Sequence, residues 1–500
     1  ISMNELDAVR QQFTTAWRSR IHPSQTVIFL GTASCGRAAG ALETRQAILD
    51  TLQELGIQAN LIEVGCIGPC YLEPLMDVAI LGLPRISYAN VTPAKAKRIL
   101  KACLVDGDLQ PALAAGHFGS GDFTAQSGIP RFFDLPMLKP QVRIILKNCG
   151  LIDPEDLGSA LDAGAYTGLA QALAMGPEQV IHEVKLSGLR GRGGAGFGTW
   201  KKWDLTRAAQ GHPKYVVCNA DEGDPGAFMN RALLEGDPHA VLEGITIGGF
   251  AVGASEGIIY VRAEYPLAVE RLRLAIRQSR ETGLLGENIL GSGFSFSIRI
   301  REGAGAFVCG EETALIASLE GQRGMPRPRP PFPADRGYKG CPTLINNTET
   351  FGAIPAILRE GGEWYTRFGT PNNPGTKTFS LVGKSRHTGL IEIPLGMTLR
   401  QVVEEIGGGT ARPFKAVQTG GPLGGCLPAE KLDTPITYET MRDLGSIMGS
   451  GGLIVMDEST CIVDMARFFV QFACDESCGN CTPCRNGTRI LRDTLDQIIH

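Results

Sequence analysis

The sequence predicts a multidomain protein of mixed α/β class. Its 500 residues exceed the roughly 100–200 residues of one typical domain. Short apolar segments alternate with longer helical patterns, which is typical of βα units. The composition is 43% hydrophobic, and 64 glycines are spread over non-repetitive sequence, so the chain is globular rather than collagen-like or disordered.

Residues 1–115 predict a small α/β domain with a thioredoxin-like order of elements. A polar helical stretch comes first, and the cysteines follow in two turns, one within 31–40 and one at 66–70. A last helix is expected after Thr92, because Pro93 suits the first helical position. Strands are expected at 26–30, 60–64, 77–81 and 87–89, with a helix at 42–55.

The rest of the chain divides into a linker and three further units. Residues 116–135 are rich in Gly, Ser and Ala and predict a linker. Residues 136–370 predict a larger α/β domain, in which the proline-rich run at 327–333 must be a loop. Residues 371–460 predict a β-grasp-like domain, and residues 461–500 a helical, cysteine-rich domain. Expected elements are strands at 215–219, 257–262, 378–382 and 389–393, and helices at 265–282 and 398–406.

Charge and cysteine usage exclude several classes of protein. A net charge of −4 without basic clusters gives no indication of nucleic-acid binding. No apolar run reaches the roughly 20 residues of a membrane helix, so direct membrane insertion is not expected. The 14 cysteines are too few for a disulfide scaffold. We therefore expect a cytoplasmic protein whose clustered cysteines bind metal.

The sequence ESCGNCTPCRNG at 476–487 predicts an iron–sulfur site. Cys478, Cys481 and Cys484 lie three residues apart, which lets one loop present three thiolates to a [4Fe–4S] cluster. The fourth ligand is expected beyond residue 500, with Cys474 as the alternative. Zinc binding and unligated buried thiols are the competing interpretations.

A second cysteine group lies in the N-terminal domain. Cys35, Cys66 and Cys70 could hold a [2Fe–2S] cluster, which ordinarily has four thiolates. A fourth cysteine five residues after Cys35 would complete the usual spacing, but Gly40 stands there. Ser34 is one candidate for the missing ligand. The alternative is a turn with purely structural cysteines.

The glycine-rich run from Gly191 to Gly196 formally matches GxGxxG. Its preceding segment is helical rather than a buried strand, so the motif alone is weak evidence for a dinucleotide fold. It does indicate backbone that a ligand approaches closely. Arg192 and Lys202 supply positive charge near that backbone for a phosphate or an anionic ring.

Several motifs together resemble one family. They are GLRGRGGAGF (188–197), CNADEGDPGAF (218–228), GAFVCGEET (305–313), PPFP (330–333), INNTET (345–350) and ESCGNCTPCRNG (476–487). This set is similar to the NADH-oxidising flavoprotein subunits of 51-kDa type. These occur in respiratory complex I, in NAD-linked hydrogenases and formate dehydrogenases, and in electron-bifurcating complexes. The resemblance covers about 140–500, and the N-terminal unit resembles a thioredoxin-like [2Fe–2S] domain fused ahead of it.

The resemblance implies a Rossmann-like FMN/NADH domain with a defined set of contacts. Glycine amides and asparagines would donate hydrogen bonds to FMN, and acids would accept them from ribityl hydroxyls. The implied FMN residues are Gly191, Arg192, Gly193, Lys202, Asn219, Asp221, Glu222, Gly310, Glu311, Asn346, Asn347 and Thr350. The implied NADH residues are Phe197, Asp224, Glu312 and Phe332.

The resemblance also implies a function. NADH would pass a hydride to FMN, which would release single electrons to the [4Fe–4S] cluster, so no side chain needs to act as nucleophile or base. Implied partners are a thioredoxin-like [2Fe–2S] subunit and a larger iron–sulfur subunit of a hydrogenase, formate dehydrogenase or bifurcating complex. A peripheral complex I subunit is the alternative. Asp224 and Leu205 depart from the complex I pattern and motivate another, an electron-wire subunit with impaired NADH binding.

Overall fold

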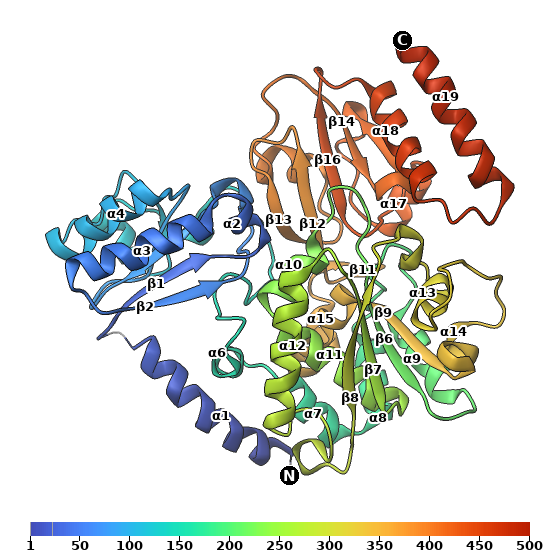
Figure 1. The fold of residues 1–500 in the computed structure, drawn as a ribbon, viewed down its shortest axis with the longest axis horizontal. Coiled ribbons are helices and arrows are strands. Elements are labelled where there is room, and N and C mark those ends of the chain that lie inside the picture. The colour runs from blue at the N-terminus through green and yellow to red at the C-terminus, as the bar shows by residue number, and fades with distance from the viewer. Residues whose placement is uncertain (1, 23) are drawn as a thin grey trace.

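The computed structural model describes residues 2–22 and 24–500. Within these residues the chain forms two five-stranded sheets, a four-stranded sheet and a two-stranded ribbon. Two helices follow at the C-terminal end, so the mixed α/β, multidomain class predicted from the sequence is confirmed. Figure 1 shows the first sheet at the left, separated by helices from the four-stranded sheet, with the C-terminal helices in red at the upper right.

The first sheet has the order β2-β1-β3-β4-β5. β1 and β2 are parallel, and the other neighbours are antiparallel. The Thr92 hydroxyl accepts a hydrogen bond from Lys95 N and caps α4 as expected. The elements are β1 (Thr26–Gly31), α2 (Ser34–Ala38), α3 (Ala41–Leu55), β2 (Ala59–Val64), β3 (Met76–Ala79), β4 (Ile86–Tyr88), α4 (Pro93–Lys101) and β5 (Ala114–His117).

Helix α1 (Ser2–Arg20) joins the first unit to the centre of the molecule. Leu6 is fully buried in the central core, whereas Trp17 packs with Val27 of the first sheet. Arg18 pairs with Asp162 at 2.6 Å on the central side. The helix therefore fixes the two units to one another through both apolar and ionic contacts.

Residues 116–135, predicted to be a linker, are structured. They contain the end of β5, helix α5 (Gly121–Ser127) and a short 3₁₀ turn at Phe132–Asp134. Phe132 is fully buried and stacks on Phe118 with ring centroids 5.0 Å apart. The small residues dominate the composition, but the interspersed aromatic residues give the segment a core of its own.

The central sheet is entirely parallel, with the order β8-β7-β6-β9. Val216 and Cys218 of β6 face the core that contains α11 and α15, whereas Val217 faces the core beneath α13. Helices thus cover both faces, as parallel sheets require. The strands are β6 (Tyr215–Ala220), β7 (Glu256–Arg262), β8 (Ser297–Gly303) and β9 (Thr343–Asn347). The helices are α6 (Leu157–Asp162), α7 (Thr167–Met175), α8 (Pro177–Leu186), α9 (Thr199–Ala208), α10 (Met229–Gly236), α11 (Pro238–Val252), α12 (Pro266–Glu281), α13 (Glu312–Leu319), α14 (Pro333–Arg336), α15 (Thr348–Glu360) and α16 (Gly362–Tyr365).

The third sheet has the order β13-β12-β16-β14-β15 and carries a separate apolar core. Only its β12–β16 pair is parallel among the described strands of this sheet. The helix expected at 398–406 ends in a π-helical segment, Gln401–Ile406. Its elements are β12 (Thr376–Gly383), β13 (Gly389–Pro394), β14 (Phe414–Thr419), β15 (Gly425–Pro428), α17 (Tyr438–Asp443) and β16 (Gly452–Asp457). The separate two-stranded ribbon consists of β10 (Gly369–Thr370) and β11 (Asn373–Pro374).

The C-terminal unit is a pair of helices, α18 (Ile462–Asp475) and α19 (Thr488–Ile499), which pack together. Arg467 of α18 donates to Asp496 of α19 at 2.7 Å. The cysteine loop joins the two helices. Among the residues that the structure describes, none of the helices combines the length and apolar character needed to cross a bilayer.

Candidate functional site

The predicted flavin residues gather at the carboxyl edge of the central sheet. The chain steps from β6 outward to β7 and β8, then returns to place β9 on the other side of β6. Ligands of open parallel sheets bind where the strand order reverses in this way. Asn219 and Asp221 lie at the end of β6, and Asn346 and Asn347 lie at the end of β9.

The glycine loop lies over the start of α15, beside the end of β9. Gly191 N donates to Phe197 O at 2.8 Å, which closes the loop. The Thr350 hydroxyl accepts from Arg192 N at 2.9 Å. A Cβ on Gly193 would lie 3.4 Å from the Cβ of Asn347, so the loop backbone packs directly on that residue. The loop and the asparagine pair, which are distant in sequence, therefore form one surface.

Arg192 does not present its guanidinium to this surface, contrary to the sequence prediction. The side chain is fully buried, and its five N–H donors are all directed at acceptors inside the protein. The acceptors are the carbonyls of Thr376 (3.0 Å), Arg190 (3.1 Å) and Pro374 (3.1 Å) and the hydroxyls of Tyr365 (3.1 Å) and Tyr438 (3.5 Å). Arg192 supports the loop from behind, and only its backbone faces the site.

Lys202 brings positive charge to the end of β9. Its ammonium donates to Ile345 O at 3.0 Å and pairs with the Glu312 carboxylate. Glu312 also lies 3.7 Å from Arg329. Glu311 is used differently, because its carboxylate caps α13 through Thr313 N at 2.9 Å and Ala314 N at 3.0 Å. Lys202 and Glu312 thus form a half-buried charged pair at the rim of the site.

Asp221 carries a carboxylate oxygen with no partner. Its Oδ1 lies 3.3 Å from Arg262, but the buried Oδ2 has no hydrogen bond within the described part of the chain. Burial raises the pKa of Asp221 to about 7, against the lowering effect of Arg262. Gly310 lies next to this oxygen, since a Cβ there would be 3.9 Å away. An unsatisfied buried acceptor at this edge suits a ligand hydroxyl.

Glu222 makes its hydrogen bonds within the protein, at the turn after β6. Its carboxylate accepts hydrogen bonds from Asn230 N at 2.9 Å and Arg231 N at 3.1 Å, and from the Tyr265 hydroxyl at 3.3 Å. These donors lie at the start of α10 and before α12. Glu222 therefore holds the turn after β6, and burial raises its pKa.

The three asparagines have distinct structural roles. Asn219 Nδ2 donates to Gly310 O at 2.9 Å and ties β6 to the segment after β8. Asn346 Oδ1 accepts from the buried Trp203 at 2.9 Å. Asn347 caps α15 through its Oδ1, which accepts from Glu349 N at 2.8 Å. In each case one atom of the side-chain amide is held by the protein, the nitrogen in Asn219 and the oxygen in Asn346 and Asn347. The other atom of that amide is left for a ligand.

Two of the predicted nucleotide contacts are exposed aromatic rings. Phe197 is 50% exposed and Phe332 is 51% exposed, with Arg329 lying 5.8 Å from the Phe332 ring. Leu205 is also exposed on α9.

Asp224, the third predicted nucleotide contact, accepts a hydrogen bond from Ser450 in the loop before β16, and burial raises its pKa. Asp224 therefore joins the central unit to the third sheet.

The cysteine loop of the C-terminal unit docks on the segment that follows β8. Phe307 N donates to Glu476 Oε2 at 2.8 Å, and the Phe307 and Phe472 rings lie 5.2 Å apart. Arg323 donates to Cys478 O at 3.0 Å. Cys478 and Cys484 are half-buried and Cys481 is exposed. The cysteine loop is thus held against the segment between β8 and α13, which also carries Gly310.

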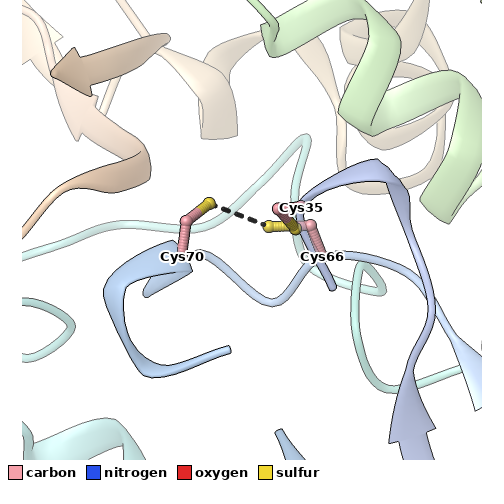
Figure 2. Close-up of side chains that lie close together, drawn as sticks. All are labelled: Cys35, Cys66 and Cys70. Carbon is pink, nitrogen blue, oxygen red and sulfur yellow. Dashed lines mark hydrogen bonds between the residues drawn. The ribbon is translucent and has the colours of Figure 1, made fainter. Parts of the chain in front are cut away.

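The N-terminal cysteines form a compact group. The Sγ atoms of Cys35, Cys66 and Cys70 all lie within 4.8 Å of one another. Those of Cys66 and Cys70 are 3.6 Å apart, the contact drawn as a dashed line in Figure 2. Cys35 lies in the short helix α2 rather than in the turn expected from its glycines. Hydrogen bonds, first from Cys35 and then from Cys70, hold the pKa of Cys66 well below its usual range. No other group of three potential ligands this close occurs in residues 2–22 and 24–500.

Sequence reasoning missed Glu73 and Glu235, which flank these cysteines. The Cys35 thiol points at Glu73 Oε1 over 3.7 Å, and Ser34 Oγ donates to Glu235 Oε1 at 2.6 Å. Glu73 follows Cys70 by three residues, a spacing that a 3₁₀ turn brings to one side. That spacing is the only signal in the sequence, and Glu235 gives none because it is distant in the chain.

The comparisons with known proteins agree with this geometry. Residues 184–356 match the family described as the Nuo51 FMN-binding domain, and residues 464–500 match the NADH-ubiquinone oxidoreductase-F iron-sulfur binding region. The chain is 56% identical to the HndC subunit of the NADP-reducing hydrogenase of Solidesulfovibrio fructosivorans, over 72% of this chain and 74% of that protein. It is 44% identical to the F 2 subunit of the NADH-quinone oxidoreductase of Rhizobium meliloti (strain 1021), over 69% of this chain and 82% of the relative.

A solved structure extends the likeness to the full length. The NAD⁺-reducing [NiFe]-hydrogenase in its H₂-reduced state matches with a TM-score of 0.64 and 28% identity. That match covers 100% of this chain and 81% of the hydrogenase chain. The same hydrogenase in its air-oxidized state gives a TM-score of 0.61 over 98% of this chain.

Proposed function

Because the chain belongs to the family of NADH-oxidising flavoprotein subunits, we propose that it oxidises NADH at bound FMN and delivers the electrons to a [4Fe–4S] centre. The protein is an NADH dehydrogenase-type oxidoreductase and works as an electron-transfer subunit of a larger redox complex. The reverse reaction, NAD⁺ reduction, uses the same site. The observation that carries the proposal is the contact between the cysteine loop and the carboxyl edge of the central sheet.

The residues at the strand-order reversal fit FMN. The unpartnered Oδ2 of Asp221 is an acceptor for a ribityl hydroxyl, and the glycine loop offers backbone next to Asn347 for a phosphate or ring edge. When bound, FMN converts the two-electron chemistry of NADH into one-electron steps. The proposed FMN residues are Gly191, Gly193, Lys202, Asn219, Asp221, Gly310, Glu311, Asn346, Asn347 and Thr350, with Arg192 and Glu222 fixing the backbone behind them.

Side chains at the rim would bind and orient NADH. Phe197 and Phe332 each expose about half of their ring, which leaves apolar surface for stacking on adenine. Glu312 accepts from Lys202 with one oxygen and faces Arg329 with the other, so its position is fixed before a nucleotide hydroxyl arrives. Asp224 would bind NADH with a carboxylate that the hydrogen bond from Ser450 holds in place. No proton transfer by a side chain is required for hydride transfer.

Cys478, Cys481 and Cys484 would hold the [4Fe–4S] cluster. The three thiolates come from one loop, and a fourth is needed. Arg323 and Arg485 bond to carbonyls of this loop, at Cys478 O (3.0 Å) and Gly479 O (2.8 Å), and keep it folded.

The finer fold and the partners belong to the same proposal. We assign 1–115 as a thioredoxin-like domain with a [2Fe–2S] site, 136–370 as the Rossmann-like FMN/NADH domain, 371–460 as β-grasp-like and 461–500 as the iron–sulfur domain. The partners would be a thioredoxin-like [2Fe–2S] subunit and a larger iron–sulfur subunit. A hydrogenase-type complex is favoured over complex I, because the identity to the hydrogenase subunit is higher.

A second candidate function is an electron-wire subunit with weak nucleotide binding. Asp224 favours it, because Ser450 already donates a hydrogen bond to this carboxylate. Leu205, the other departure from the complex I pattern, stands exposed on α9. This subunit would bind flavin and clusters but turn over NADH poorly.

Anaerobic addition of NADH to the FMN- and iron-reconstituted chain tests both candidates. We expect flavin absorbance to bleach and ferricyanide to be reduced with NADH as donor. Cys481→Ser should lose cluster iron yet keep NADH-dependent bleaching, whereas Cys426→Ser, at another exposed cysteine, should keep both. Absence of bleaching in the wild type would contradict the proposed NADH oxidation and support the wire subunit.

A further inference from the structure

The N-terminal cysteines leave one ligand position without a thiol. A [2Fe–2S] cluster takes two protein ligands on each iron, four in all. Cys66 and Cys70 form one pair, with sulfur atoms 3.6 Å apart. Two ligands on one tetrahedral metal with bonds of about 2.3 Å lie about 3.8 Å apart, so this pair suits one iron. Cys35 is left to share the second iron with a residue that is not cysteine.

The two positions suggested by the sequence do not supply this ligand. Gly40 has no side chain and adopts a left-handed conformation (φ 99°) at the start of α3. Ser34 is bound to the buried Glu235 by both its hydroxyl (2.6 Å) and its backbone N–H (2.9 Å). Freeing the Ser34 hydroxyl would leave a buried carboxylate short of one donor, which is costly.

Glu73 occupies the remaining place. Its Oε1 lies 3.7 Å from Cys35 Sγ, close to the separation of the Cys66–Cys70 pair. A sulfur and an oxygen on one tetrahedral metal lie about 3.5 Å apart. The other oxygen, Oε2, accepts from Leu75 N at 2.8 Å, which fixes the orientation of the carboxylate. Glu73 is thus paired with Cys35 in the way that Cys66 is paired with Cys70.

The surroundings of Glu73 are shaped for a carboxylate. The residue is only 7% exposed, and a buried acid without a positive partner is rare. A Cβ on Gly31 would lie 2.8 Å from Glu73 Oε2, and a Cβ on Gly36 would lie 3.3 Å from the same atom. Two glycines therefore make room for the acid. Binding to a metal ion would compensate the negative charge of the Glu73 carboxylate, which is costly to bury without a partner.

We propose that Glu73 is the fourth ligand of a [2Fe–2S] centre in the N-terminal unit, sharing one iron with Cys35 while Cys66 and Cys70 bind the other. This inference rests on the proposed [2Fe–2S] site of that unit. The Cys35, Cys66 and Cys70 thiolates and one carboxylate oxygen make a three-sulfur, one-oxygen set. Such a set is spectroscopically distinct from four thiolates, because oxygen replaces sulfur on one iron only.

The test compares the full chain with Glu73→Gln and Glu73→Cys after anaerobic reconstitution with FMN, iron and sulfide. Glu63→Gln is the matched control, since Glu63 lies in the same unit and pairs with Arg45. After dithionite reduction, the two-iron EPR signal is measured at temperatures where four-iron signals have broadened. We expect Glu73→Gln to lower that signal about 10-fold or more. Glu73→Cys should keep it with shifted g values, and the control should match the wild type.

The outcomes separate this inference from the proposed function. Equal signal intensity and g values in wild type, Glu73→Gln and Glu73→Cys would overturn the ligand assignment. Zinc in place of iron, or no two-iron signal in the wild type, would overturn it too. In either case, NADH-dependent bleaching of the flavin in the same samples would leave the NADH–FMN proposal standing. Glu73→Cys keeps the test decisive if Glu73→Gln fails to fold.

Discussion

The Glu476 carboxylate accepts a hydrogen bond of 2.8 Å from the backbone N–H of Phe307. This contact joins the cysteine loop to the segment between β8 and α13, a segment that also carries Gly310. The charge of Glu476 contributes to raising the pKa of Asp221, which places the loop close to the carboxyl edge of the central sheet. The position of the cysteine loop against the central unit is therefore set by this hydrogen bond, by the hydrogen bond from Arg323 to Cys478 O, and by the packing of Phe307 on Phe472.

Glu476→Gln should loosen the docking of the C-terminal helices. A hydrogen bond to a charged acceptor contributes about 1.5–3 kcal/mol, and an amide oxygen is a weaker acceptor than a carboxylate. We expect faster hydrogen exchange in α18 and slower electron transfer to ferricyanide, with flavin bleaching by NADH unchanged. Asp475→Asn is the control, because Asp475 bonds to Gln471 on the exposed side of α18. Equal exchange rates in both variants would contradict this role of Glu476.

Arg192→Leu should destabilise the whole central unit. The substitution leaves three carbonyls and two tyrosine hydroxyls without their buried donor, and each unsatisfied group costs about 1–3 kcal/mol. We expect a loss of at least about 3 kcal/mol in the free energy of unfolding, measured by urea denaturation of the apoprotein. Arg442→Leu, at a side chain that is 72% exposed, should change stability little. A small effect at Arg192 would mean that its hydrogen bonds are dispensable.

The contrast between Arg192 and the cysteine motifs shows what the sequence could predict. Spacing along the chain was sufficient to propose the loop of Cys478, Cys481 and Cys484 and to predict the strand that ends near Asn219, because these features are local. The strand that ends at Asn347 was not predicted. The direction of a long side chain depends on distant residues, and Tyr365 gives no sign in sequence that it accepts from Arg192. The glycines of the loop remain predicted flavin contacts, whereas the guanidinium of Arg192 is bonded inside the protein.

The dependence of side-chain direction on distant residues also explains why the sequence did not distinguish Asp221 from Glu222. Asp221 and Glu222 are neighbours at the end of β6, and the sequence treated them alike. Both lie just beyond β6, which ends at Ala220, and they meet different partners. Asp221 Oδ2 has no hydrogen bond among the described residues, while Glu222 bonds to the start of α10. Likewise, aromatic residues among the glycines and serines of 116–135 created a packed segment where composition predicted a linker.

The stability of the apoprotein should fall with rising pH because of Asp221. Its pKa is about 7 in the folded chain and about 3.9 in an unfolded one, so the folded state binds the extra proton between about pH 4 and pH 7. Stability from this group is present below that window and is lost as pH rises through it, on the order of 2–4 kcal/mol. Asp221→Asn cannot ionise and should lack this loss.

Urea denaturation at pH 5 and pH 8 measures the effect. Other buried acids titrate in the same range, including Glu243 with a pKa of about 7, so the informative quantity is the difference between wild type and Asp221→Asn at each pH. The variant should gain stability relative to the wild type on going from pH 5 to pH 8. A constant difference would show that Asp221 is already ionised at pH 5.

Phe332→Ala should weaken NADH binding without changing the chemical step. The ring is half exposed at the rim and is approached by Arg329, and stacking of a base on an aromatic side chain contributes about 1–3 kcal/mol. We expect KM for NADH in the ferricyanide assay to rise about 10-fold, with kcat unchanged, since the lost contact is equal in ground and transition states. Phe468→Ala removes a similarly exposed ring from α18 and should leave KM unchanged. A fall in kcat at constant KM would instead place Phe332 in the packing of the flavin pocket, because only a misplaced ring system would slow hydride transfer.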